Sequence, residues 1–118
     1  MIQNVRREDS VTVVELAGRF DMSTAPDIKA RLHQIIASGQ SLLVIDLRDV
    51  NFLDSSALGV LVNCLRRCVA AGGDLCLAEV PEFAHSIFEL TRLTRVFKME
   101  QSDAAAVQAM QEDASRKA

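Results

Sequence analysis

Two hydroxyls and a carboxylate follow one another in the segment Asp54-Ser55-Ser56. An almost wholly apolar run at residues 42–47 precedes them, and an apolar segment of helical period follows, so a strand is expected to pass into a helix here. The first N–H groups of a helix have no partner inside it, and the helix dipole favours negative charge there. A phosphate on Ser55 would therefore be compatible with the fold, while it would add about −1.5 to −2 charges to the surface.

Catalysis by these hydroxyls would need a neighbouring base or a phosphate-binding loop. His33 and His85 are the only histidines, and on helical wheels both point away from the apolar stripe, which indicates solvated surface residues. The sequence has neither the GxSxG pattern of a hydrolase nor a GxGxxG or GxxxxGK[ST] loop. Asp46, Asp49 and Asp54 would suit a phosphate-accepting receiver domain, but the N-terminal acidic pair and the later lysine of such domains are missing. We therefore expect a protein that is not an enzyme and has no cofactor.

The three cysteines, Cys64, Cys68 and Cys76, lie within apolar segments. Cys64 and Cys68 are one helical turn apart, so a redox or metal pair is one interpretation. A zinc site would need further ligands, and no CxxC pair or nearby histidine supplies them. Small buried apolar residues are the interpretation that we favour, with no metal site.

The composition limits the classes of partner. A chain of 118 residues is long enough for one domain with a core of its own, so residues 1–118 are expected to form a single domain. The net charge of −3 argues against nucleic acid or an anionic membrane as the main partner. No stretch approaches the about 18 apolar residues of a membrane span, and the N-terminus lacks the apolar core of a signal peptide. These features predict a cytoplasmic protein.

Strand and helix patterns alternate along the chain. Residues 10–17 alternate in polarity and are rich in β-branched residues, which predicts a half-buried strand that ends at Gly18. Thr24 and Pro26 are typical of a helix start, with Thr24 as the N-cap. The expected core face of that helix consists of Ile28, Leu32, Ile35 and Ile36.

The rest of the chain continues this alternation. In chain order, we expect a central strand at 42–47, a helix at about 56–71 closed by Gly72-Gly73, a strand at 75–80, a helix opened by Pro81, a short extended segment at 95–99 and a final helix from about Asp103. The helix after Pro81 is expected to pack through Phe83, Ile87 and Leu90, with Phe88 flanking. Ser102 is the expected cap of the last helix.

The fold class follows from this order of elements. Alternating strands and helices predict an α/β domain with a mixed, largely parallel sheet of four to five strands and about four helices packed on it. The last helix has a thin apolar stripe, and its residues after about Glu112 are expected to fray.

The helix after Asp54 has two distinct faces on a helical wheel. We expect its core contact from Leu58, Leu61, Val62, Leu65 and Val69. The opposite face carries Gly59, Val60, Asn63, Arg66 and Arg67. A glycine inside a helix costs about 1 kcal/mol relative to alanine, so Gly59 and an outward Val60 indicate a small surface on which another backbone could dock.

At these residues the chain resembles STAS-domain proteins of the anti-sigma factor antagonist type, and the resemblance spans nearly the whole chain. It rests on Asp46-Leu47, on residues 50–59, on Ala71-Gly72-Gly73 with the strand at 75–78, and on Gly18-Arg19-Phe20-Asp21 with Thr24-Ala25. One departure is Ala57, where the family usually has glycine.

The resemblance implies a protein switch. The unmodified domain would bind an anti-sigma factor that is also a serine kinase and so release a sigma factor. Phosphorylation of Ser55 would switch binding off, a serine phosphatase would reverse it, and Ser56 is a less favoured acceptor. The residues expected at the partner interface are Asp21, Thr24, Asp54, Ser56, Gly59, Val60, Asn63 and Arg67. The domain would be a monomer or a weak dimer.

An alternative interpretation is a constitutive scaffold. In that case the domain would be a STAS subunit of a lipid-transport or signalling assembly, bound through the same helix and never phosphorylated.

Overall fold

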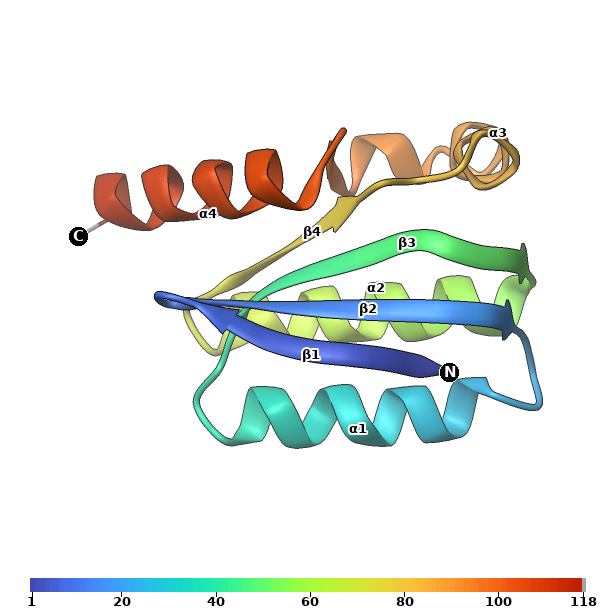
Figure 1. Ribbon diagram of the computed structural model, residues 1–118, viewed down its shortest axis with the longest axis horizontal. Coiled ribbons are helices and arrows are strands. Elements are labelled where there is room, and N and C mark those ends of the chain that lie inside the picture. Colours follow the sequence, from blue (N-terminus) through green and yellow to red (C-terminus); the bar gives the residue numbers. More distant parts are fainter. Residues whose placement is uncertain (118) are drawn as a thin grey trace.

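Five strands form one sheet in the order β1-β2-β3-β4-β5 (Figure 1). The computed structural model describes residues 1–117. The strands are β1 (Ile2–Glu8), β2 (Val11–Phe20), β3 (Leu42–Leu53), β4 (Asp74–Ala78) and β5 (Lys98–Glu100). β1 runs antiparallel to β2, and the other neighbouring pairs are parallel. The expected α/β fold with a mixed, largely parallel sheet is confirmed.

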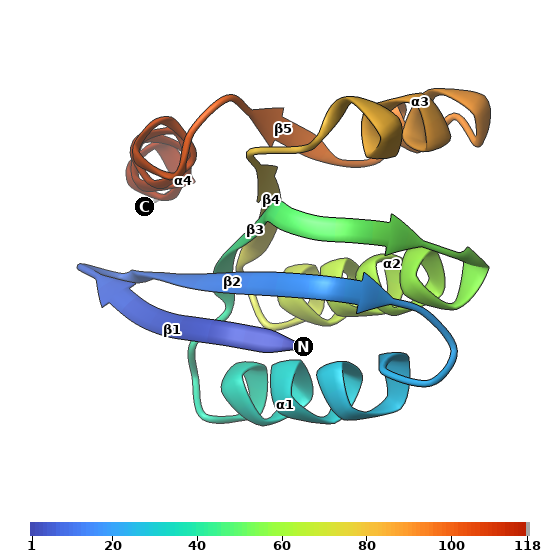
Figure 2. The same cartoon turned by 45° about the vertical axis from the view of Figure 1, so that its right-hand side comes forward.

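Four helices cover the two faces of the sheet and make three layers (Figures 1 and 2). They are α1 (Ala25–Ala37), α2 (Ser55–Ala70), α3 (Glu82–Leu90) and α4 (Asp103–Lys117), and a short 3₁₀ turn spans Leu93–Arg95. α1, α2 and α3 bury their apolar sides in one large core with one face of the sheet. α4 covers the other face through Ala106, Val107 and Met110.

The edge strand β1 was not predicted. Its sequence IQNVRRE has only two apolar residues, and all its side chains are exposed or half-buried. Because an edge strand has a partner on one side only, its pattern carries little of the burial signal that marks central strands.

Two further strands differ from the prediction in length. β2 does not end at Gly18 but continues to Phe20, because Gly18 adopts a positive φ of 82° at an irregularity in the pairing with β3. β3 continues past Leu47 to Leu53, through a stretch in which buried and exposed residues are mixed. The longer strand places Asp54 directly at its end.

The core face of α2 was predicted only in part: Leu61 is buried, and Leu58, Val62 and Leu65 pack against the core from half-buried positions. The buried residues are Ala57, Val60, Leu61, Cys64 and Cys68. Val60, expected to point outward, is 6% exposed, whereas Val69, expected in the core, is 56% exposed. The reason is that α2 packs against α1 as well as the sheet, which turns its buried face toward α1. The predicted end of α2 is correct, since Gly72 has a φ of +85° and a Cβ on Gly73 would lie 2.0 Å from the Ser41 carbonyl oxygen.

α3 is also turned about its axis relative to the prediction. Ala84 and Phe88 are its buried residues, whereas Phe83 is 39% and Leu90 85% exposed. Phe88 packs edge-to-face on Phe97, with 5.8 Å between the ring centroids, and this contact with a later segment sets the orientation. α1 buries Ile28, Leu32, Ile35 and Ile36 as predicted.

α4 begins as the sequence predicts. The Ser102 hydroxyl accepts a hydrogen bond from the Ala105 N–H at 3.1 Å, so Ser102 caps the helix. The helix is continuous past Glu112 to Lys117. Fraying of its last residues concerns motion and stays a prediction.

Candidate functional site

Ser55 is the first residue of α2 and is exposed. It lies where β3 ends and the chain turns into the helix, at the edge of the sheet formed by the carboxyl ends of β2 and β3 (Figure 1). The N–H groups of the first helical turn point toward this end of α2. The hydroxyl is therefore placed where an added negative charge is electrostatically favourable for the helix.

Asp54 connects α2 to the loop before α1. Its Oδ1 accepts a hydrogen bond from the Ala57 N–H at 3.1 Å, which caps α2. Its Oδ2 accepts a hydrogen bond from the Met22 N–H at 3.0 Å. One half-buried carboxylate thus holds the beginning of α2 and the loop at residues 21–24 together.

Asp21 organises that loop from within. Its Oδ1 accepts hydrogen bonds from the Ser23 hydroxyl at 2.6 Å and the Ser23 N–H at 3.0 Å, and its Oδ2 accepts one from Arg19 Nε at 3.2 Å. These bonds, with the Ser23 hydroxyl contributing most, lower the pKa of the Asp21 carboxyl from 3.8 to about 2. The loop therefore carries a fixed negative charge over the physiological pH range.

Thr24 has a different contact from the one predicted. It occupies the N-cap position of α1, but its side chain makes no capping hydrogen bond. Its hydroxyl instead donates to the Arg19 carbonyl at 2.9 Å and accepts from the Asp21 N–H at 3.0 Å. Thr24 therefore closes the loop rather than capping the helix.

An open groove of about 530 Å³ lies between the start of α1 and the exposed flank of α2. The residues that line it are Met22, Ala25, Pro26, Lys29, Ser56, Gly59, Val60 and Asn63. The structure thus brings Ser56, Gly59, Val60 and Asn63 together, beside the loop that holds Asp21 and Thr24. Arg67 is exposed one helical turn beyond Asn63 and does not line the groove.

His33 was expected to be a solvated surface residue, but it is half-buried. Its Nε2 lies 2.7 Å from Asn63 Oδ1, so a hydrogen bond joins α1 to α2 next to the groove. His85 is exposed, as expected, and its Nδ1 lies 2.7 Å from Glu89 Oε1 one turn along α3.

Several residues around Ser55 were not predicted from the sequence. Met22 is 75% exposed on the loop, and Phe52, the last residue but one of β3, is 37% exposed. The guanidinium of Arg19 stacks on the Phe52 ring at 4.1 Å from its centroid. The sequence contained a sign of this surface: Met22 and Phe52 are large apolar residues that stand next to polar residues, Met22 in the loop before α1 and Phe52 just before Asp54.

The three cysteines are buried, with at most 1% of each residue exposed. Burial raises the pKa of Cys64 to about 11 and the pKa values of Cys68 and Cys76 to about 12. The thiols are therefore protonated at neutral pH and enclosed, which agrees with the prediction that they serve as small apolar residues.

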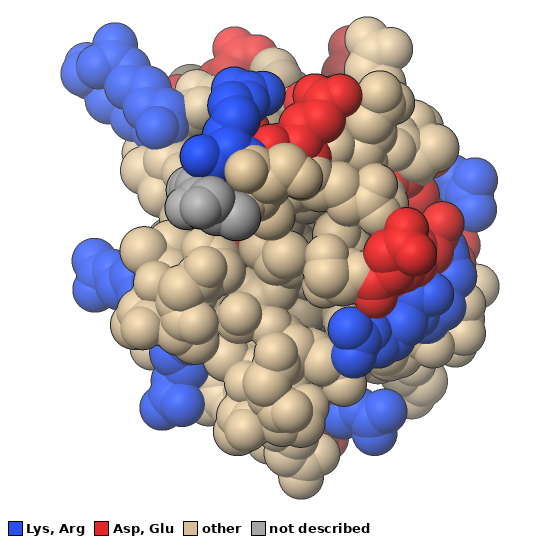
Figure 3. Space-filling model, turned by 90° about the vertical axis from the view of Figure 1, so that its left-hand side faces the viewer, with Lys and Arg blue, Asp and Glu red and all other residues tan. Residues whose placement is uncertain are grey.

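At the end of the molecule opposite Ser55, the described residues present charges of both signs. On the face seen in Figure 3, lysines and arginines are interspersed with aspartates and glutamates. Within residues 1–117, no helix is both long and apolar enough to cross a membrane.

Comparisons with known proteins give a family match and several similar proteins. A sequence model of the STAS domain matches residues 3–106. The anti-sigma-B factor antagonist of Bacillus subtilis is 28% identical over 105 residues, which cover 89% of this chain and 95% of that protein. The crystal structure of an anti-sigma factor antagonist from Mycobacterium paratuberculosis has a TM-score of 0.83 at 27% identity, over 92% of each chain.

A more distant structure has the same fold. SpoIIAA of Bacillus in its phosphorylated form superposes with a TM-score of 0.70 at 18% identity, over 90% of this chain and 97% of that chain. At this identity the likeness concerns the fold alone.

Proposed function

Because this chain belongs to the STAS domain family, we propose that it is an anti-sigma factor antagonist whose binding is switched off by phosphorylation of Ser55. The observation that carries the proposal is the exposed position of Ser55 at the first residue of α2. Its relatives include proteins named anti-sigma factor antagonists. A protein of the same fold, SpoIIAA, exists in a phosphorylated form.

The unmodified protein would bind its anti-sigma factor at the surface around Ser55. The groove between α1 and α2 begins next to it, and the exposed Met22 offers an apolar side chain at its rim. Gly59 lines the groove without a side chain, so a partner backbone could approach α2 closely there. A groove with an exposed apolar residue at its rim suits the binding of a protein partner rather than catalysis.

The kinase activity would belong to the partner and use ATP, and a serine phosphatase would restore the hydroxyl. Ser55 is exposed, whereas Ser56 is half-buried at the groove, which favours Ser55 as the acceptor. Asp21 and Asp54 lie on the segments next to the acceptor, as constituents of the loop and of the helix cap.

The phosphate would act on binding rather than on the fold. Burying an unpaired charge in an interface costs several kcal/mol. Since each 1.4 kcal/mol corresponds to a factor of about ten in affinity, a loss of about a thousandfold is expected from one modification. The carboxylates of Asp21 and Asp54 lie on the same surface, so the phosphate would increase the negative charge that a partner has to accommodate there.

Phosphorylation with the serine-kinase anti-sigma factors of the native host tests the acceptor. Wild type, Ser55→Ala and Ser56→Ala are incubated with kinase and ATP, and the phosphate is located by mass spectrometry. We expect stoichiometric label in wild type and Ser56→Ala and none in Ser55→Ala. Label on Ser55→Ala would refute the assignment.

Binding of the anti-sigma factor tests the switch. Ser55→Asp adds a negative charge, and Ser55→Asn has nearly the same shape without the charge. We expect Ser55→Asp to bind at least about tenfold more weakly than Ser55→Asn, since one carboxylate carries roughly half the charge of a phosphate. Equal binding by the two variants, together with no label on Ser55, would favour the constitutive scaffold instead.

A further inference from the structure

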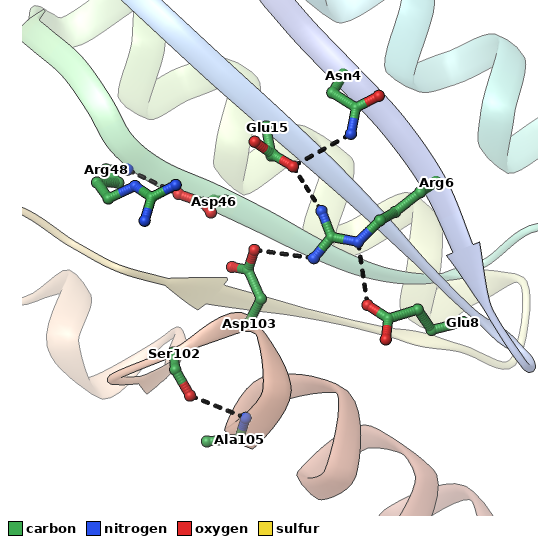
Figure 4. Close-up of polar contacts among 9 residues, drawn as sticks. All are labelled: Asn4, Arg6, Glu8, Glu15, Asp46, Arg48, Ser102, Asp103 and Ala105. Atoms are coloured by element: carbon green, nitrogen blue, oxygen red, sulfur yellow. Dashed lines mark hydrogen bonds and ion pairs between the residues drawn. The ribbon is translucent and has the colours of Figure 1, made fainter.

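A second cluster of charged side chains lies on the sheet face that α4 covers, away from Ser55. Strand pairing places one row of residues side by side across all five strands: Asn4, Glu15, Asp46, Ala78 and Glu100. Asp103, the first residue of α4, lies above this row, next to Asp46 and Arg6 (Figure 4). The row and the helix thus bring several carboxylates together at one place.

Among the residues that the structure describes, Arg6 is the cation that forms ion pairs with this cluster. Its guanidinium forms an ion pair with Glu15, a second with Asp103 at 3.0 Å, and a third with Glu8 at 3.1 Å. A single positive charge is therefore shared by three carboxylates. The ion pairs of Arg6 are with these three carboxylates and not with Asp46. The Asp46 Oδ1 accepts a hydrogen bond from the Arg48 N–H at 2.8 Å.

The carboxylates nearest α4 are poorly compensated. Asp46 is 2% exposed. One carboxylate oxygen from each of Asp46, Glu79 and Asp103 lies within 4.8 Å of the other two. Asp103 Oδ1 is buried and has no hydrogen-bond partner among the residues that the structure describes. A buried, unpaired carboxylate oxygen close to a second buried carboxyl group is the arrangement in which one proton serves both.

We propose that a proton shared between Asp46 and Asp103 fixes the start of α4 to the sheet, so that this attachment weakens as the pH rises from acidic to neutral. Asp46 holds the proton and donates it to Asp103 Oδ1. Asp103 holds the charge, because it faces Arg6 and stands in the first turn of α4, where the helix dipole favours an anion.

The direction of the pH dependence follows from burial. Burial raises the pKa of Asp46 from 3.8 to about 6; the Arg48 N–H opposes this shift, while the Asp103 and Glu79 carboxyl groups add to it. Because the folded value lies above the unfolded one, the stabilisation is fully present below about pH 3.8 and is lost as the pH rises through about 6. Above that range Asp46 adds its own negative charge next to the carboxyl groups of Asp103 and Glu79, while Arg6 is already paired with Glu8, Glu15 and Asp103. Glu100 lies at the margin of the cluster, in the same row of the sheet.

Asp46→Asn removes the titratable proton of residue 46 and leaves the other charged side chains of the cluster unchanged. The amide keeps an acceptor for the Arg48 N–H and supplies a permanent donor to Asp103 Oδ1, as the protonated carboxyl would. Asp49→Asn is the matched control, since Asp49 lies on the same strand and is exposed.

Amide hydrogen exchange of residues 105–107 in the full chain measures the attachment, after correction for the intrinsic pH dependence of exchange; the N–H groups of Ala105 and Ala106 bond to Ser102 at the start of α4. In wild type and Asp49→Asn, protection should fall about tenfold or more between pH 5 and 7.5, since a shift of one in pKa corresponds to a tenfold change in equilibrium. In Asp46→Asn, protection should be independent of pH and higher than wild type at pH 7.5. A pH-independent wild type, or an unchanged pH dependence in Asp46→Asn, would overturn the proposal.

Two further measurements keep the proposal testable if Asp46→Asn folds poorly. The carboxyl carbon resonance of Asp46 in wild type should show a titration step near pH 6, and the resonance of Asp103, its neighbour, should change shift in the same step. Titration of Asp46 below about pH 4.5, or no response of the Asp103 resonance to it, would contradict a shared proton. Restoration of protection at pH 7.5 by millimolar CaCl2 or MgCl2 would show that a cation, rather than a proton, closes the cluster, and would also overturn the proposal.

Discussion

Asp54 uses its two carboxylate oxygens for two different tasks. One oxygen caps α2 through the Ala57 N–H, and the other accepts the Met22 N–H from the loop before α1. The cap is a local bond, because it joins residues that are only three positions apart in the sequence. The bond to Met22 spans 32 residues and becomes visible only in the fold. It ties the loop that carries Asp21 to the segment that carries Ser55.

We predict that Asp54→Asn separates these two tasks. The amide oxygen can still cap α2, but the amide nitrogen cannot accept from Met22. The loss of this one exposed hydrogen bond should lower the free energy of unfolding by about 1 kcal/mol. If the loop positions the partner at Ser55, the phosphorylation rate should fall about fivefold, because a free-energy change of about 1 kcal/mol corresponds to a factor of about five. Chemical denaturation and a kinase assay measure the two effects.

Asp54→Ser provides the comparison, because serine also caps helices and also lacks the second acceptor. Both variants should slow phosphorylation to a similar extent. Asp54→Ala removes the cap as well and should cost about 1 kcal/mol more in stability. Phosphorylation at the wild-type rate in Asp54→Asn and Asp54→Ser would exclude a positioning role for the bond to Met22.

At the scale of elements, α2 supplies half of the residues that line the groove of the candidate site. Its flank toward α1 forms the groove with Gly59, Val60 and Asn63. The structure leaves open space around Gly59, since an added Cβ would meet no atom within 4 Å. The protein itself therefore gives no steric reason for a glycine in the middle of this helix.

We predict opposite effects of Gly59→Ala on stability and on binding. Alanine should stabilise the helix by about 1 kcal/mol. The added methyl group would project into the groove and should weaken anti-sigma factor binding, by about tenfold if a partner backbone contacts α2 there. Thermal unfolding and titration calorimetry measure the two quantities. Unchanged affinity in the stabilised variant would show that the partner does not approach Gly59.

The rotation of α2 is the part of the site that its sequence could not supply. Leu58, Val62, Leu65 and Val69 make a better apolar stripe on a helical wheel than the observed face does. The buried face instead includes Ala57, Cys64 and Cys68, whose small side chains allow close packing. Helical periodicity gives the width of the apolar side, but the position of a neighbouring helix decides which edge of it is covered. The cap, by contrast, depends on residues 54–57 alone and was predictable.

Longer-range features were less predictable still. Arg6 and Asp103 form an ion pair across 97 positions of sequence, and β1 joins the sheet through a mostly polar edge strand. Neither the ion pair nor the edge strand has a sequence pattern among neighbouring residues from which it could be predicted. The order of the remaining strands and helices was predictable because alternating β and α segments have few ways to pack.

At the scale of the whole molecule, the sheet separates two layers with different tasks. The candidate site belongs to the layer of α1 and α2, whereas α4 packs on the opposite face with a core of its own. Each layer contains a methionine whose substitution can test its role: Met22 in the layer of the candidate site and Met110 in the layer of α4. Met22 is 75% exposed on the loop of the candidate site, and Met110 is 1% exposed beneath α4.

We predict that the same substitution has opposite consequences at these two positions. Met110→Ala removes a buried side chain and should lower the free energy of unfolding by about 2–5 kcal/mol. Because the sheet lies between Met110 and Ser55, the variant should bind the anti-sigma factor normally while it is folded. Met22→Ala should leave stability within about 0.5 kcal/mol of wild type but weaken binding by about tenfold, as expected of an exposed apolar anchor. Denaturation curves, and binding measured well below each melting temperature, distinguish the two layers. Weakened binding by folded Met110→Ala would mean that α4 and the site around Ser55 are coupled through the sheet, and the pH dependence proposed for α4 would then extend to partner binding.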